Sequence, residues 1–410
     1  MKRNCYAGTN CCIRSRANEL RYSASGRKVF RPDNNSTWWK PINCGRHPNM
    51  NNLRIIDADG HVQERDANWQ ELLDPPYRKH APSMVMGADG RTHLLLEGKI
   101  WAKPSGFGCG IGTAPITRKP RTTTGMWDPV QRLKDMDLEG IDTAVNFGTT
   151  VFLSLPFLEN HDLACAIAHG YNTWLHEYSK TDPRRLKGVA LVAQQEPLEA
   201  AKELERCVKQ LGFVAVAVAA HSAGRNLDHP DLYPFYAKAE ELGVPVCVHV
   251  GSGRPAAAAE RFDNPYFVHA TTHAFEQMIG VMCIVGGGIL ERFPKLKVAF
   301  LEAGAGWVPY WMERLDEHYE YMSPAVPLMK KEPSEYMKSE QVYYSFEPDE
   351  RTLNFVMDYV GEDRFVFASD YNHGDSKFPH TVESVTGRKN LTESQLRKLM
   401  CDNARRLYNI

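Results

Sequence analysis

Residues 213–220 read Phe-Val-Ala-Val-Ala-Val-Ala-Ala, a run without a polar side chain. A strand with one wet face alternates apolar and polar residues, whereas a strand covered on both faces is apolar throughout. The run is therefore typical of an inner strand in a parallel sheet that has helices packed outside it.

Further short apolar runs alternate with segments of helical period from Asn52 onward, which predicts repeated βα units. Eight such strands favour a (β/α)8 TIM barrel over a doubly wound open sheet, which the alternation also fits. The predicted strands are 53–58, 143–147, 188–193, 214–219, 244–250, 297–301, 342–346 and 364–368. The predicted helices include 197–211, 232–242, 272–293 and 352–359.

Two segments differ from the barrel pattern. Residues 75–126 are rich in Gly and Pro and lie between the first two predicted strands, which predicts a flap over the barrel mouth. The aromatic residues Trp101, Phe107 and Trp127 form either a lining there or the flap's own small core. Residues 1–49 hold ten Lys or Arg against two acids and show no periodicity, which predicts a disordered tail before a barrel at residues 50–410. The tail is either a targeting or interaction segment or an extension upstream of a start at Met50.

Composition narrows the class of partner. The chain has 410 residues and a formal net charge of -1, which gives no reason to expect nucleic acid or an anionic membrane. No apolar run approaches the roughly 20 residues that cross a bilayer. Ten cysteines show no repeated CxxC spacing and are expected to be reduced thiols. We therefore expect a cytoplasmic protein that acts on a small molecule.

Ionisable residues stand at the ends of four predicted strands. In the first of these strands Asp57, Asp59 and His61 alternate, so they share a face. The carboxyl ends of barrel strands meet at one mouth, and His and carboxylate groups bind Zn, Mn or Fe. The sequence predicts one divalent cation, with two also possible, held by residues at these ends: Asp59, His61, His249, Glu302 and Asp370.

Three further histidines are candidates for a second metal or for substrate. His269 and His273 are spaced i, i+4 before or at the start of a predicted helix, so both can face the mouth. A helix cap and a packing residue explain this pair equally well. His373 follows Asp370 closely and is a candidate substrate contact.

From about Leu53 to its C-terminus the chain resembles the amidohydrolase-related family, in the branch of aminocarboxymuconate-semialdehyde decarboxylase and the resorcylate decarboxylases. The resemblance implies that Asp59 and His61 are metal ligands from the first strand, with His249 from the fifth and Asp370 from the eighth. It also implies a homodimer or a related assembly. It rests on these blocks: Ile56–His61, Val248–His249, Leu290–Val298 leading into Glu302–Trp307, Ala368–Tyr371 and Asn403–Tyr408.

Two positions depart from the family pattern. Asp59 stands where the family's well-known decarboxylases carry His or Glu, which exchanges one metal ligand for another. Glu302 stands where the family's decarboxylases carry a histidine that donates a proton or activates water. Glu302 therefore either acts as the acid or base in place of that histidine, or bridges a second metal. Asp370 and His273 are the other candidate catalytic residues. The resemblance implies a hydrolase or a nonoxidative carboxy-lyase acting on a small organic or aromatic carboxylate. The alternatives are a dinuclear iron or manganese oxygenase, as in a minor branch of the family, and a non-catalytic barrel that partners an active paralogue.

Overall fold

An eight-stranded parallel sheet is the centre of the computed structural model, which describes residues 53–86, 92–101, 123–249, 261–262 and 264–410. The predicted tail at 1–49 lies outside these residues. Neighbouring strands of the sheet follow chain order, as repeated βα units require. In that order the strands are β1 (Ile56–Val62), β5 (Thr143–Gly148), β6 (Leu186–Leu191), β7 (Ala215–Val218), β10 (Val246–Val248), β11 (Val298–Phe300), β12 (Val342–Phe346) and β13 (Phe365–Phe367).

Hydrogen bonds join the two ends of this sheet. The Asp370 amide, just beyond β13, donates to the Asp59 carbonyl at 3.0 Å, and the His61 amide donates to the Tyr371 carbonyl at 2.9 Å. The Tyr408 hydroxyl, near the C-terminus, donates to the Ala58 carbonyl at 2.7 Å. These bonds link β1 to the last strand, so the predicted (β/α)8 barrel is confirmed over an open sheet.

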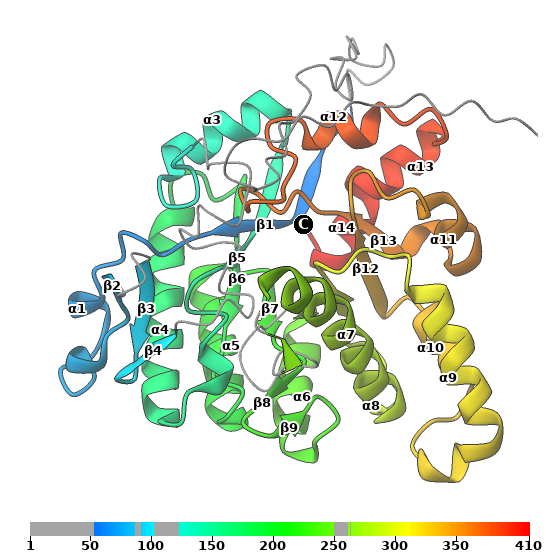
Figure 1. Cartoon of the computed structure of the whole chain (residues 1–410), viewed down its shortest axis with the longest axis horizontal. Helices are drawn as coiled ribbons and strands as arrows, with labels where there is room; N and C mark the ends of the chain where they lie inside the picture. The colour runs from blue at the N-terminus through cyan, green and yellow to red at the C-terminus, as the bar shows by residue number, and fades with distance from the viewer. Residues whose placement is uncertain (1–52, 87–91, 102–122, 250–260, 263) are drawn as a thin grey trace, which may run out of the picture. The chain divides into compact units, whose positions relative to one another are not determined.

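Helices pack outside the strands, as Figure 1 shows for the helices that follow β5, β6 and β7. Two of them end where the sequence places Gly212 and Gly243, whose φ angles of 72° and 68° let the chain turn back into the next strand. The helices are α1 (Trp69–Leu72), α3 (Pro129–Glu139), α4 (His161–Ser179), α5 (Pro197–Leu211), α6 (Tyr233–Leu242), α7 (Pro265–Gly286), α8 (Ile289–Arg292), α9 (Val308–Met322), α10 (Pro333–Met337), α11 (Leu353–Val360), α12 (Thr381–Thr386), α13 (Glu393–Arg397) and α14 (Asn403–Tyr408).

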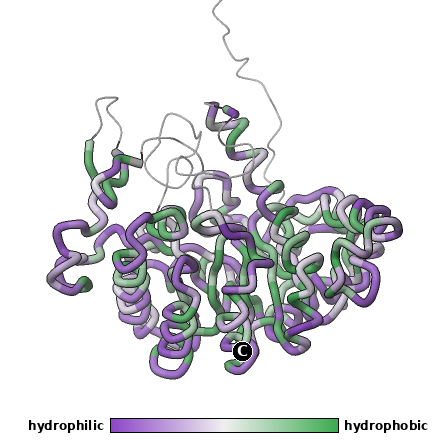
Figure 2. The backbone as a smooth tube through the Cα atoms, turned by 90° about the horizontal axis from the view of Figure 1, so that it is seen from below, coloured by the Kyte–Doolittle hydropathy of each residue, from purple (hydrophilic) through white to green (hydrophobic). Residues whose placement is uncertain are grey.

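The apolar strands form the core. Every residue of β7 is buried, as the run at 213–220 predicts for a strand covered on both faces. Figure 2 shows apolar segments in the middle of the backbone tube and hydrophilic segments along its outer edge. Among the described residues, no helix has the length and apolar character that crossing a membrane requires.

The boundaries of two predicted elements differ most from those in the structure. The first strand is Ile56–Val62, not 53–58, because its pairing with β5 resumes at Gly60 after a register shift that begins at Asp57. The helix predicted at 272–293 begins at Pro265, where the Asn264 side chain caps it, and ends at Gly286 before the separate helix α8. Asn-Pro is a helix-start signal, whereas the run of glycines at 286–288 interrupts the helical hydrogen bonds.

The described part of the predicted flap is a three-stranded antiparallel sheet of β2 (Ser83–Met86), β3 (Thr92–Leu96) and β4 (Lys99–Trp101). The Glu97 carboxylate in its last turn accepts from the amides of Glu159 and Asn160, directly before α4. Trp127 lies against Arg65, whose guanidinium carbon is 4.8 Å from the indole ring. The Trp101 side chain and residues 87–91 and 102–122, which include Phe107, lie outside the described part, so a cover over the mouth stays a prediction.

Candidate metal centre

The carboxyl ends of four barrel strands carry the ionisable residues of the centre. Asp59 and His61 lie within β1 rather than beyond its end, because the strand runs on to Val62. His249 directly follows β10, Glu302 lies two residues beyond β11, and Asp370 lies three residues beyond β13. The barrel therefore brings together side chains that are distant in the sequence.

Two β1 residues and His249 form the deeper part of the centre. The Asp59 Oδ1 atom lies 3.6 Å from His61 Nε2 and 3.5 Å from His249 Nε2. All three side chains are buried, with exposed fractions of 2% or less. One ligand atom from each lies within 4.8 Å of the others, a spacing that fits one cation.

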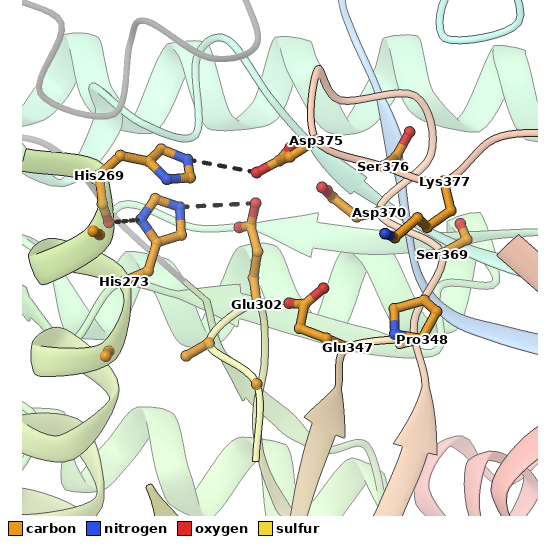
Figure 3. A pocket seen from close by; sticks show the side chains of 14 residues that line it. His269, His273, Glu302, Glu347, Pro348, Ser369, Asp370, Asp375, Ser376 and Lys377 are labelled. Carbon is orange, nitrogen blue, oxygen red and sulfur yellow. Dashed lines mark hydrogen bonds and ion pairs between the residues drawn. The ribbon is translucent and has the colours of Figure 1, made fainter. Parts of the chain in front are cut away.

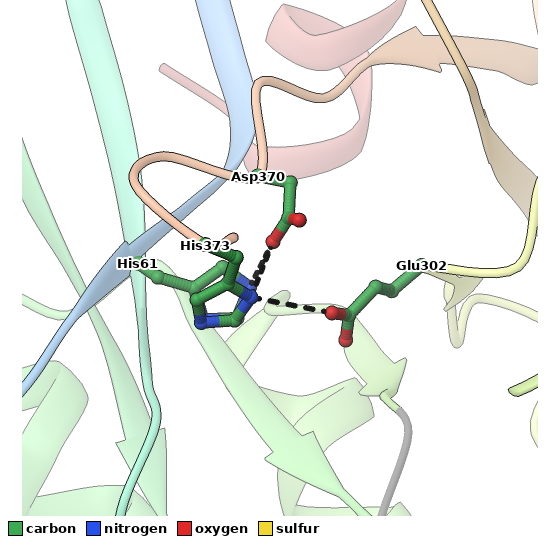
Figure 4. Close-up of side chains that lie close together, drawn as sticks. All are labelled: His61, Glu302, Asp370 and His373. Carbon is green, nitrogen blue, oxygen red and sulfur yellow. Dashed lines mark ion pairs between the residues drawn. The ribbon is translucent and has the colours of Figure 1, made fainter. Parts of the chain in front are cut away.

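A second group shares His61 with the first and adds Glu302, Asp370 and His373 (Figure 4). The His373 Nδ1 atom lies 2.6 Å from Asp370 Oδ1 and 3.4 Å from Glu302 Oε1. His61 Nε2 lies 3.4 Å from the same Asp370 oxygen, and its ring stacks on the His373 ring. Glu302 also reaches the first group, since its Oε2 atom is 3.2 Å from His249 Nε2.

Two residues of the centre have unusual backbone conformations. Glu302 and Asp370 have φ angles of 59° and 49°, in the left-handed region that side chains other than glycine rarely adopt. The Glu302 amide is held by the Ser345 hydroxyl oxygen at 2.9 Å, and the Asp370 amide by the Asp59 carbonyl. Strained residues of this kind cluster at functional sites, because surrounding structure must hold them in place.

The electrostatics of the centre call for a cation. Burial raises the pKa of Asp59 and raises that of Asp370 well above its usual range, while burial lowers the pKa of His61 well below its own. Within the described residues, Asp59 Oδ1 and both His61 ring nitrogens are buried without a hydrogen-bond partner. Buried polar atoms without partners are rare in folded proteins. A divalent cation would satisfy Asp59 Oδ1 and one of the His61 nitrogens, Nε2, which lie 3.6 Å apart, so the donor set fits a metal.

The centre forms one wall of a cavity of about 210 Å³. Figure 3 shows His269 and His273 entering it from α7, with Glu347 after β12 and Asp375 after β13 on other sides. His269 Nε2 lies 3.9 Å from Asp375 Oδ2, and His273 Nε2 lies 3.9 Å from Glu302 Oε1. Both histidines lie within α7 and face the cavity, so neither is a helix cap.

The His273 ring has a defined tautomer. Its Nδ1 atom lies 2.9 Å from the His269 carbonyl oxygen, which can only accept, so Nδ1 carries the hydrogen. Burial lowers the pKa of His273 to about 4, so its ring is neutral. The lone pair of Nε2 therefore faces the Glu302 carboxylate. Two acceptors that face each other repel unless a proton or a cation lies between them.

Asp57 does not share the site with Asp59 and His61, although alternation along the strand places all three on one face. Its carboxylate accepts from the Ser369 amide at 2.9 Å and from the Ser369 hydroxyl at 2.6 Å, behind the metal-ligand groups. The register shift after Asp57 separates it from Asp59 and His61. Asp375 was not singled out from the sequence, although its place two residues after His373 in the same loop was a usable signal.

Glu64, three residues after His61, gives a prediction about stability. Its buried carboxyl group accepts from the Val151 amide, and burial raises its pKa from 4.5 to about 7. A carboxyl with a raised folded pKa stabilises the fold fully below its unfolded pKa. That stabilisation, about 3 kcal/mol at ~1.4 kcal/mol per pKa unit, is lost as the pH rises through the folded value.

We expect Glu64→Gln to abolish this loss of stability at high pH, because the amide oxygen still accepts from the Val151 amide and never becomes charged. Denaturant unfolding in the presence of a chelator should show the variant and wild type with similar stability near pH 5. Near pH 8 the variant should be the more stable. Parallel pH profiles for the two proteins would contradict the assignment.

Three comparisons with known proteins bear on the family and the fold of the chain. A family model described as Amidohydrolase matches residues 56–410. The 2-amino-3-carboxymuconate-6-semialdehyde decarboxylase of Dictyostelium discoideum is 25% identical over 86% of this chain and 91% of its own. The gamma-resorcylate decarboxylase of a Polaromonas species is 28% identical over 64% of this chain and 83% of its own. A solved dihydroxybenzoic acid decarboxylase from Polaromonas, with bound manganese and 2-nitroresorcinol, has a TM-score of 0.62 at 22% identity, covering 87% of this chain and 97% of that one.

Proposed function

Because the chain belongs to the amidohydrolase family, we propose that it is a metal-dependent carbon–carbon lyase that removes the carboxyl group from a small aromatic or unsaturated carboxylate. The proposal rests on two overlapping groups of metal-binding side chains that share His61, one with Asp59 and His249 and the other with Glu302, Asp370 and His373. Among the described residues, the buried Asp59 Oδ1 atom and the His61 ring nitrogens have no hydrogen-bond partner, which supports a cation at this place. The named relatives are decarboxylases, which favours this chemistry over hydrolysis and over oxygenation.

These four residues would hold the cation, with Glu302 at its open side. When bound, a divalent cation polarises a carboxylate or phenolate oxygen of the substrate. Manganese, which the related Polaromonas structure contains, is the first metal to test, ahead of zinc and iron. Carboxylate and imidazole donors accept all three metals.

The chain's own residues supply the proton. In a decarboxylation the bond from the ring carbon to the carboxyl carbon breaks, carbon dioxide leaves, and the electron pair left on the ring carbon takes a proton. We assign delivery of this proton to Glu302, which lines the cavity. Although burial acts in the opposite direction, His249 and His373 hold the pKa of Glu302 well below its usual range, so Glu302 must first take the proton from His373, which lies 3.4 Å from its Oε1 atom. His273 Nε2, 3.9 Å from the same oxygen, carries no hydrogen and supplies none. Asp370, 2.6 Å from His373, holds that imidazole in place.

The dinuclear alternative has one observation in its favour. His273 Nε2 and Glu302 Oε1 are two acceptors facing each other, and a second cation between them would resolve the contact as well as a proton does. His269 and His373 would then complete a second metal site. This reading predicts two metal ions per chain and oxygen consumption, whereas the lyase predicts one metal ion and no need for oxygen.

Metal removal tests the proposal. The full chain is stripped with a chelator, assayed for carbon dioxide release from gamma-resorcylate and related ortho-hydroxy and ortho-amino benzoates, and then titrated with Mn²⁺. We expect activity to vanish with the metal and to return as one equivalent binds, with no oxygen uptake. Oxygen uptake with two bound ions would establish the oxygenase. Full activity in the chelated protein would remove any role for a metal, and a metal-loaded chain with neither activity would favour the non-catalytic barrel. The homodimer and the cytoplasmic location stay predictions from the sequence.

A further inference from the structure

A fully buried arginine lies behind the metal-ligand groups. Arg132, on α3, is 0% exposed, and its Nη2 atom is 3.5 Å from Asp57 Oδ2. Its guanidinium carbon lies 3.6 Å from the centre of the Tyr371 ring. Within the described residues, its Nε and Nη1 atoms have no hydrogen-bond partner. Burying a guanidinium with so few partners is costly, so its retention calls for a reason other than stability.

The guanidinium contacts both segments that carry the ligands. A Cβ atom added at Gly60 would lie 2.4 Å from Arg132 Nη2, so the guanidinium rests against the backbone between Asp59 and His61. On the other side it stacks on Tyr371, which directly follows Asp370 and lies two residues before His373. Arg132 therefore sets the spacing between the β1 ligands and the ligands after β13.

The residues on both sides of Asp370 are anchored to this arginine and its neighbours. Ser369 donates through its amide and its hydroxyl to Asp57, and the Tyr371 hydroxyl donates to Asp135, one turn after Arg132 on α3. Asp370 itself has the left-handed φ of 49°. Such a conformation persists only where the surroundings fix it, and here Ser369 and Tyr371 fix it from each side.

We propose that Arg132 is a positioning residue of the metal centre, which holds Asp370 and His373 at the right distance from Asp59 and His61. The inference rests on the proposed function, because it concerns the affinity of this centre for its cation. Groups that orient metal ligands without touching the metal typically change metal affinity about 10- to 100-fold when they are replaced. Arg132 does not contact the cavity and so has no part in substrate binding.

The test measures the affinity of the full chain for Mn²⁺, by following the EPR signal of the free ion during titration. Arg132→Met keeps the length and apolar part of the side chain, and Arg132→Lys keeps the charge but loses the flat stacking surface. We expect Arg132→Met to weaken Mn²⁺ binding at least about tenfold, and Arg132→Lys to weaken it less. Tyr371→Leu should weaken it like Arg132→Met, and the double variant should be no weaker than either single one, because both act through one contact.

Arg364 supplies a matched control. It is also a mostly buried arginine over a tyrosine, with its guanidinium carbon 5.0 Å from the Tyr343 ring, but it precedes β13 at the opposite end of the barrel. Arg364→Met should reduce the unfolding temperature and leave Mn²⁺ affinity within about twofold of wild type, since distant sites act independently. If Arg364→Met loses as much Mn²⁺ affinity as Arg132→Met, general destabilisation of the fold explains both losses and the proposal is overturned.

The remaining outcomes are also decisive. Unchanged Mn²⁺ affinity in folded Arg132→Met would overturn the positioning role and leave the proposed function intact. If that variant does not fold, Tyr371→Leu and Arg132→Lys decide the question by the same measurement. Wild-type protein that binds no Mn²⁺, Zn²⁺ or Fe²⁺ would overturn the proposed function and this inference together.

Discussion

Replacing Asp370 with asparagine is expected to reduce kcat of the metal-loaded protein by about 10³-fold, within the range seen when a general acid or base is lost. The amide has nearly the shape of the carboxylate but lacks its charge and one of its acceptor oxygens. It therefore loses an oxygen for the cation and the ion pair at 2.6 Å that orients His373. Mn²⁺ titration of the variant and steady-state assays at saturating metal would separate weaker metal binding from slower chemistry.

Asp375→Asn is the matched control for this variant. Asp375 lines the same cavity in the same loop, but it faces His269 and stands outside the metal-ligand groups. We expect its kcat to change by less than about tenfold, as for a substrate or rim contact. Should Asp370→Asn retain wild-type turnover at saturating metal, the assignment of Asp370 to the centre would be wrong.

Replacing Glu302 with glutamine is expected to lower kcat by about 10²- to 10³-fold, because glutamine cannot carry the proton to the substrate carbon. A second readout follows the proton itself. In heavy water the wild-type protein should exchange the ring hydrogen of the product at the position of the lost carboxyl group, and NMR would show the signal disappear. Glu302→Gln should lose this exchange together with turnover.

Glu347→Gln makes the same change at the end of the neighbouring strand, in the same cavity. Burial and the nearby Asp375 and Glu302 carboxylates raise the pKa of Glu347 to about 7, so Glu347 can hold a proton at neutral pH, whereas the neighbouring histidines hold the pKa of Glu302 well below its usual range. We expect Glu347→Gln to keep most of the exchange. If Glu347→Gln loses the exchange while Glu302→Gln keeps it, the proton donor is Glu347, which follows β12, and not Glu302, which follows β11.

The barrel could be predicted from the sequence because its strands are nearly free of polar residues. A run such as 213–220 has no wet face, so it fits few places other than an inner strand. The candidate ligands could be predicted for the same reason, since His249 and Asp370 interrupt or follow apolar runs at the end where barrel strands meet. Neither conclusion needed the exact strand boundaries, which differ at β1 by several residues.

The parts that the sequence did not predict depend on contacts between distant segments. Nothing local distinguishes Asp57 from Asp59, because alternation places both on one face; the register shift with β5 and the partner Ser369 decide between them. Arg132 lies on a helix whose sequence is typical of a barrel surface, yet it is buried against Tyr371. The helix predicted to begin at residue 272 begins at Pro265, and the start signal for it is Asn264-Pro265.

The hydrogen bonds that join β1 to the segment after β13 also have a consequence for how the protein is made. Asp59 and His61 leave the ribosome early, whereas Asp370, His373 and the Tyr408 that bonds to the Ala58 carbonyl follow only after the other seven strands of the barrel. A chain that stops before residue 365 lacks the closing strand β13 and, of the proposed metal ligands, Asp370. The complete set of proposed ligands therefore forms only once the last strand of the barrel has joined the first.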